Sequence, residues 1–180
     1  EKPENQIYKI LKADILIECF QDEKAQQLLC NLKFKKDSLL HFQSEILISK
    51  IFIKQKNYKL AEEILLELRK IFSKQKILYL NLSDLYFKSK ELEKGISILK
   101  EGIVNFPKFI PLRFNLAIMY RNLGLIELSI KTHIEILLVD KFNSNSFYEL
   151  STMYDFASHD EQLKNLLNCE IGNLAPKEKI

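Results

Sequence analysis

The chain is 180 residues long, 47% hydrophobic and 28% charged, a composition that excludes an intrinsically disordered protein and leaves room for one domain or a short repeat array. It contains only four glycines and four prolines, too few for the many turns of a β-sandwich or β-barrel, so mostly helical structure is expected. The net charge is +3, with 27 basic and 24 acidic residues spread along the whole length, which disfavours a nucleic-acid-binding surface.

Residues 4–36 predict a pair of helices, because two runs of apolar residues with helical spacing flank a polar break at Gln21-Asp22. Asp22 is suited to cap the second helix. A 34-residue period that begins later in the chain does not extend into this pair, since Glu18 stands at its aromatic position. We assign residues 1–37 to an N-terminal helical pair, which is either a degenerate repeat or a cap.

Three columns of apolar residues repeat every 34 residues in the rest of the chain. They consist of Phe52, Tyr86, Tyr120 and Tyr154; of Ile48, Leu82, Leu116 and Leu150; and of Ile46, Leu80, Phe114 and Tyr148. Three columns in one register indicate an internal repeat, the signature of arrays in which each unit packs on its neighbours.

Each repeat unit predicts two helices joined by a short connection. The expected pairs are 38–54 with 58–72, 79–87 with 92–103, 114–120 with 126–138, and 144–157 with 160–171. Polar residues or glycine interrupt the apolar pattern inside each unit, and Pro107 ends the second unit because proline cannot continue a helix. Residues 176–180 form a tail.

These units resemble the tetratricopeptide repeat (TPR) family. Its signature places small residues where the two helices of a hairpin cross, an aromatic residue late in the first helix, and a proline after the second. The second unit matches this pattern with Tyr79, Leu82, Ser83, Tyr86, Gly95, Leu99, Gly102 and Pro107. The resemblance covers residues 42–175 and weakens toward both ends. It implies an all-α fold, a right-handed superhelical array of antiparallel helix hairpins (an α-solenoid), with four hairpins in residues 38–175.

The sequence offers no arrangement of side chains that points to catalysis. His41, His133 and His159 stand in separate units, and we find no Cys, Asp or Glu placed beside them to complete a metal site. The TPR pattern gives the position of His133 to an apolar residue, so this histidine is expected to be a packing residue, either hydrogen-bonded or partly exposed, rather than a ligand. A GxSxG motif and a glycine-rich phosphate loop are both missing. We therefore expect no enzyme activity, no cofactor and no metal.

The functional feature that remains is a surface. The resemblance implies a scaffold in which the first helices of the hairpins line a concave groove that binds a partner polypeptide. The corresponding candidate binding residues are Leu80, Asn81, Asp84, Phe87, Lys88, Phe114, Asn115, Ile118, Arg121, Asn122, Tyr148, Glu149 and Thr152. Asparagine is a poor residue inside helices, so Asn81, Asn115 and Asn122 are either donors to the backbone of a bound peptide or a reflection of AT-rich coding. Leu80 either faces a ligand or packs within the array.

The expected partner is another protein that contributes an apolar or amphipathic segment. A carboxylate clamp of the kind found in chaperone-binding TPR proteins is not matched, because Asn81 alone fits its pattern. Self-assembly through the terminal hairpin and a membrane-anchored accessory protein are the alternatives. An RNA-binding helical repeat is a weaker alternative, since repeats that recognise bases need polar side chains at fixed positions and a continuous row of basic residues.

The compartment is left open by the sequence. Cys19, Cys30 and Cys169 have no zinc spacing and read as small buried hydrophobes, which slightly favours the reducing cytoplasm. The chain starts at Glu1 rather than Met, so an upstream segment carrying a targeting signal or anchor is expected as the alternative, with a membrane-anchored or periplasmic location. The abundance of Lys, Ile, Leu and Asn suggests an AT-rich, bacterial genome.

Overall fold

The computed structural model describes residues 3–153, and this part of the chain is helical throughout, with no strand. The helices are α1 (Pro3–Glu18), α2 (Asp22–Cys30), α3 (Leu39–Lys54), α4 (Tyr58–Ile71), α5 (Lys76–Lys88), α6 (Leu92–Asn105), α7 (Ile110–Asn122), α8 (Ile126–Val139) and α9 (Ser144–Met153). None of them combines the length and the apolar character needed to cross a membrane. The predicted elements beyond residue 153 (the helix near 160–171, Tyr154, His159, Cys169 and the tail) lie outside the described residues.

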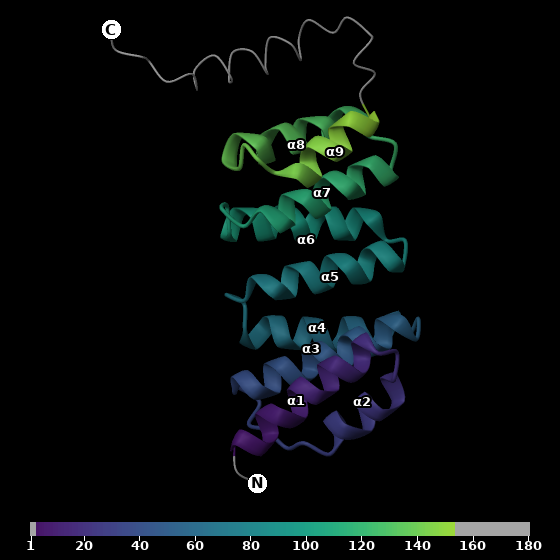
Figure 1. Cartoon of the computed structure of the whole chain (residues 1–180), viewed down its shortest axis with the longest axis vertical. Helices are drawn as coiled ribbons and strands as arrows, with labels where there is room; N and C mark the ends of the chain where they lie inside the picture. Colours follow the sequence, from purple (N-terminus) through teal and green to yellow (C-terminus); the bar gives the residue numbers. More distant parts are fainter. Residues whose placement is uncertain (1–2, 154–180) are drawn as a thin grey trace, which may run out of the picture.

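Successive helices pair into hairpins that stack along one axis (Figure 1). The pairs are α1 with α2, α3 with α4, α5 with α6, and α7 with α8, while α9 packs on α8 as the first helix of the next unit. Contacts between hairpins join neighbours in the stack, such as α3 with α5 and α5 with α7. Each hairpin therefore completes its core by packing on the next one, as expected for a helical repeat.

The same backbone turn ends the first helix of every described hairpin. Phe20, Lys56, Lys90 and Gly124 have φ angles of 57°, 60°, 64° and 75°, the left-handed region in which glycine is least strained. In each case the next N–H donates to the carbonyl five residues earlier, for example Glu91 N to Tyr86 O at 2.8 Å and Leu125 N to Tyr120 O at 2.9 Å. This is the Schellman geometry for stopping a helix.

The first hairpin repeats the others with a shift of two residues. Its left-handed residue, Phe20, lies 36 residues before Lys56, whereas the later intervals are 34. The small residues at the helix crossings follow the same shift: the pairs are Ala13 with Ala25, Ser49 with Ala61, Ser83 with Gly95, and Ala117 with Ser129, all buried. At the α7–α8 crossing, Ser129 Oγ donates to Ala117 O at 2.8 Å, which requires the close approach that small residues permit.

Two apolar clusters account for most of the buried apolar side chains in the described part of the chain. One runs from Phe42 to Tyr120 across α3 to α7, and the other lies under α1, α2 and α3 and includes Ile10, Ile17 and Ile51. Aromatic hydroxyls connect neighbouring hairpins at the cluster edges, as where Tyr86 donates to Glu62 Oε1 at 2.8 Å. The hydroxyl thus keeps a partner although most of the ring is buried.

The exposure of the cysteines differs from the sequence-based expectation. Cys19 and Cys30 are exposed rather than buried. Each lies at the end of a helix, Cys19 just after α1 and Cys30 as the last residue of α2. Among the nearby apolar residues, Ile17 and Leu29 are buried in place of the cysteines, whereas Phe20 is exposed.

A lysine holds the first hairpin against the second. Lys54 Nζ, at the end of α3, donates to Ile17 O at 2.6 Å and lies 3.4 Å from Asp22 Oδ1. The same ammonium sits 5.3 Å from the centre of the Phe20 ring. A cation beside the last carbonyls of α1 is favourable, because the C-terminal end of a helix carries partial negative charge.

Lys54→Met is expected to destabilise the first hairpin by about 1 kcal/mol, because the charge and the hydrogen bond are lost while the apolar stem is kept. Hydrogen exchange of the α1 and α2 amides measures this loss directly. Lys59→Met, at an exposed position of α4 without an ion pair to any described residue, is the matched control. Equal exchange in the two variants would show that Lys54 does not hold the hairpin.

Candidate functional site

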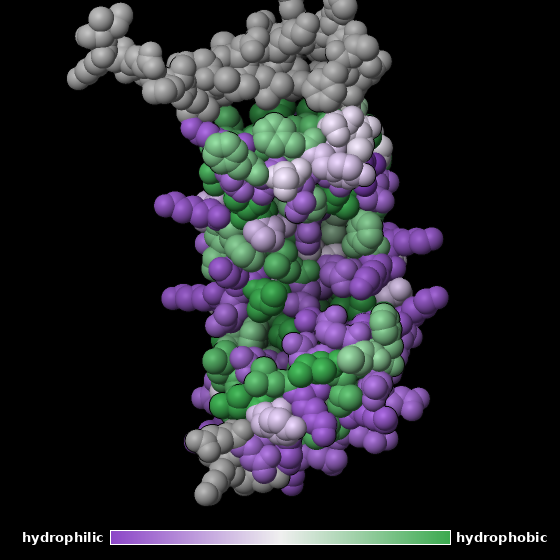
Figure 2. All heavy atoms as spheres, in the orientation of Figure 1, coloured by the Kyte–Doolittle hydropathy of each residue, from purple (hydrophilic) through white to green (hydrophobic). Residues whose placement is uncertain are grey.

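The first helices of the hairpins present one common surface, here named the first-helix face: the solvent-facing sides of α1, α3, α5, α7 and α9. Figure 2 shows apolar side chains interspersed with hydrophilic ones on the molecule, with an apolar band over the region of α1 and α3. Two hollows open on this face, one between α1, α3 and α5 and one between α5 and α7.

The larger of the two, the apolar hollow, has a volume of about 370 Å³. Its lining residues are Ile7, Ile10, Leu11 and Asp14 of α1, Phe42, Gln43, Ile46, Leu47 and Lys50 of α3, and Ile77 of α5. Ile10 and Ile46 are buried in its floor, while Ile7, Leu11 and Ile77 at its rim are 45%, 58% and 38% exposed. The rim therefore leaves large apolar side chains in contact with water.

The apolar hollow is built from equivalent positions of successive repeats. Four residues of α1 lie 36 residues before four of α3, the same shift that relates the two hairpins: Ile7 to Gln43, Ile10 to Ile46, Leu11 to Leu47 and Asp14 to Lys50. Ile77 follows Gln43 by 34 residues. Helix periodicity places such positions on one side of each helix, so stacking of the hairpins aligns them into one surface.

The smaller hollow, here named the polar hollow, has a volume of about 180 Å³. It is lined by Ser83, Asp84 and Phe87 of α5 and by Asn115, Ile118 and Met119 of α7. Four of the thirteen predicted binding residues thus lie together here. Asp84 forms an ion pair with Lys88 one turn later, with 3.0 Å between Nζ and Oδ2, so the predicted Lys88 neighbours this hollow through Asp84.

The predicted asparagines make hydrogen bonds inside the protein. Asn81 is 7% exposed and donates to Ile77 O at 2.8 Å, and the exposed Asn122 donates to Ile118 O at the same distance. Asn115 donates to Ser83 Oγ at 3.2 Å and so connects α7 with α5. Each of the three amide nitrogens thus donates one hydrogen bond inside the protein.

The remaining predicted residues are divided between core and surface. Leu80 is half-buried against the main core cluster. Arg121 forms an ion pair with Glu149 across α7 and α9. Tyr148 and Thr152 are exposed on α9, with Tyr148 at 69%. The α9 end of the face therefore combines an ion pair with an exposed aromatic and an exposed hydroxyl side chain.

Phe114 is half-buried and packs edge-on against the ring of His133, with 5.5 Å between the ring centres. His133 packs at its apolar repeat position, and it is fully buried rather than partly exposed. Its Nδ1 lies 3.3 Å from Ser146 Oγ, and its Nε2 has no hydrogen-bond partner. Burial, with a further contribution from the charge of Arg121, lowers the pKa of His133 to about 4, so the ring is neutral at physiological pH.

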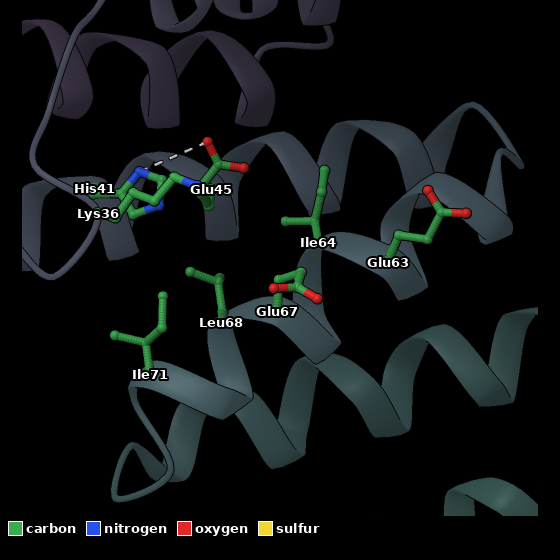
Figure 3. Close-up of a pocket in the computed structure, with 8 residues that line it drawn as sticks. All are labelled: Lys36, His41, Glu45, Glu63, Ile64, Glu67, Leu68 and Ile71. Carbon is green, nitrogen blue, oxygen red and sulfur yellow. Dashed lines mark ion pairs between the residues drawn. The ribbon is translucent and has the colours of Figure 1, made fainter.

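A third hollow, of about 320 Å³, lies between α3 and α4 beside the connection that follows α2. Figure 3 shows Lys36, His41 and Glu45 gathered at one end and Glu63 at the other, with Leu68 and Ile71 among the lining residues. It opens next to α2, which has 9 residues where α4, α6 and α8 each have 14.

His41 and Glu45 were missed as a pair in the sequence, although they lie one helical turn apart. Their Nδ1 and Oε1 atoms are 3.9 Å apart. Burial raises the pKa of the Glu45 carboxyl, and His41 opposes this shift. No group of three or more metal-ligating side chains is arranged to hold an ion in the part of the chain that the structure describes.

Comparison with known proteins supports the fold. No family model matches the chain, and no curated protein matches it either. Among solved structures, the crystal structure of YrrB, described as a TPR protein with an unusual peptide-binding site, aligns with 99% of this chain and 90% of its own, with a TM-score of 0.60 and 16% identity. This likeness confirms the predicted all-α solenoid of TPR type.

Proposed function

We propose that this TPR-like α-solenoid is a non-catalytic scaffold that binds a partner polypeptide on its first-helix face, with the apolar hollow as the main contact. The observation that carries the proposal is the exposed apolar rim formed by Ile7, Leu11 and Ile77 around the buried floor. Soluble proteins rarely leave such a patch in water unless something binds there. The structural neighbour YrrB, a TPR protein with a peptide-binding site, supports a polypeptide as the ligand.

The proposed main contact lies nearer the N-terminus than the candidate binding residues that the sequence suggested. Those lie between Leu80 and Thr152, where asparagine amides are engaged internally and ion pairs occupy much of the surface. The polar hollow remains part of the proposed site as an extension beside the apolar one. A ligand that spans both hollows contacts α1, α3, α5 and α7.

Leu11→Glu and Ile77→Glu are each expected to weaken partner binding by about 10- to 100-fold, because each removes the burial of one large apolar side chain and adds a charge. Both residues are at the rim, so the fold should be preserved. The measurement is quantitative mass spectrometry of proteins captured by the full chain, followed by titration of the captured partner.

Val104→Glu is the matched control, since Val104 is 80% exposed but lies on the second helix α6, outside both hollows. Phe114→Glu with Tyr148→Glu tests the opposite end of the face. Loss of the partner with the Val104 variant but not with the Leu11 variant would place the binding site away from the first-helix face. Loss with the Phe114 and Tyr148 pair alone would restore the sequence-based location.

A further inference from the structure

The apolar hollow offers little hydrogen bonding. Seven of its ten lining residues are apolar, and the polar ones are Asp14, Gln43 and Lys50. Asn81, Asn115 and Asn122 do not line this hollow. A ligand buried here must therefore satisfy most of its own backbone groups.

This requirement separates two kinds of polypeptide ligand. An extended segment carries an unpaired N–H and C=O at almost every residue, and burying these groups without partners is costly. A helix forms its backbone hydrogen bonds internally and can present an apolar stripe of residues one turn apart. The shortage of polar groups in the apolar hollow thus favours a helix over an extended peptide.

We infer that the ligand of the apolar hollow is an amphipathic α-helix of a partner protein, lying across α1, α3 and the start of α5. This inference rests on the proposed function, of which it specifies the ligand. The rim side chains Ile7, Leu11 and Ile77 surround its apolar stripe, and the buried floor of Ile10 and Ile46 receives the most deeply inserted residue.

Two charged side chains at the hollow favour one orientation of the ligand helix. Asp14 of α1 and Lys50 of α3 occupy equivalent repeat positions, and neither forms an ion pair with another described residue. A ligand helix with a basic residue over α1 and an acidic residue over α3 complements both. Charge complementarity of this kind selects partner and orientation more than it adds affinity.

The test is a selection from two displayed peptide libraries against the full chain. One library varies the exposed side of a stable helix of about four turns, and the other has prolines at regular intervals, which prevent helix formation. We expect binders from the helical library. Proline in the middle of a selected helix should weaken binding by about 100-fold, and Leu11→Glu by about 10- to 100-fold, while Val104→Glu has no effect.

The possible outcomes distinguish failure of the helical ligand from failure of the hollow as a binding site. Binders that come only from the proline library and are lost with Leu11→Glu would overturn the helical ligand and leave the binding function in place. Binders from either library that tolerate both Leu11→Glu and Ile77→Glu would overturn the function of the hollow itself. If sedimentation shows a dimer that Leu11→Glu dissociates, the hollow binds a second copy of this chain. If the helical library yields no binders, the proposal of a helical ligand is also refuted. Circular dichroism of each variant establishes that it is folded.

Discussion

Acidification from pH 7.5 to pH 4 is expected to cost the wild-type protein about 3 kcal/mol more stability than a His133→Leu variant. His133 is fully buried, its Nε2 has no partner, and the nearest polar group to Nδ1 is the Ser146 hydroxyl. Burial first, and the positive charge of Arg121 second, hold the pKa of His133 near 4 rather than at its ordinary 6.5. Both causes oppose a charged ring.

The sign of the effect follows from proton uptake. Below pH 6.5 the unfolded chain binds a proton at His133, whereas the folded protein does not bind one until the pH reaches about 4. The free energy of unfolding therefore falls by about 1.4 kcal/mol per pH unit as the pH drops from 6.5 to about 4. At still lower pH the ring is protonated in both states, and His133 makes no further contribution to the pH dependence. Above pH 6.5 both states hold a neutral ring, so the contribution to pH dependence vanishes.

Urea unfolding followed by circular dichroism, repeated between pH 4 and pH 7.5, measures the effect. The carboxylates titrate in both proteins, so the difference between the two curves isolates His133. Leucine at this position restores the apolar residue typical of the repeat. Parallel curves for wild type and variant would show that the buried ring accepts a proton without loss of stability in the α7–α8 hairpin.

The repeat columns predicted the hairpins because each column has a defined structural task. Ser83 and Gly95 permit the α5–α6 crossing, and carbonyls of the aromatic column accept the hydrogen bonds that end α3, α5 and α7. Requirements of this kind, for close helix packing or for the end of a helix, restrict the residue type and can therefore be recognised in the sequence. The left-handed turn residues Lys56 and Lys90 leave no comparable signal, since lysine does not favour that conformation.

The α1 side of the apolar hollow was missed because the period changes by two residues before α3. With a strict 34-residue spacing, Glu18 falls on the aromatic column and α1 appears unrelated to the face. Aligning Ala13 and Ala25 with Ser49 and Ala61 would have revealed the shift, since all four are small and buried at helix crossings. The same alignment assigns the α1 residues of the hollow to the first-helix face.

The direction of the asparagine amides could not be predicted from sequence. Within a helix an asparagine side chain can reach the carbonyl one turn earlier, which competes with any external partner. Asn81 and Asn122 take this internal bond, and Asn115 takes a hydroxyl on the neighbouring helix instead. The choice depends on rotamers and on packing between hairpins, and neither is encoded in the repeat pattern.

Leu82→Ala is expected to destabilise the array by about 2–5 kcal/mol, because deletion of a fully buried leucine loses apolar burial and leaves a cavity. Leu82 belongs to the main cluster that joins α3 to α7. Leu29→Ala removes an equally large side chain from the cluster under α1, α2 and α3. The two variants create similar cavities in different parts of the stack.

The two leucine variants should nevertheless differ in where protection is lost, because each hairpin contacts only its neighbours and stability in such arrays is a sum of local terms. Hydrogen exchange should show Leu29→Ala opening α1 and α2 while α5 to α7 keep their protection, and Leu82→Ala lowering protection from α3 through α7. A uniform loss along the chain in both variants would mean that the stack unfolds as one unit. The apolar hollow would then be lost in either variant. If the expected pattern is found, Leu29→Ala unfolds only the α1 side of the hollow and leaves the α5–α7 stack intact. Weaker ligand binding by this variant would then show that the ligand contacts the first hairpin.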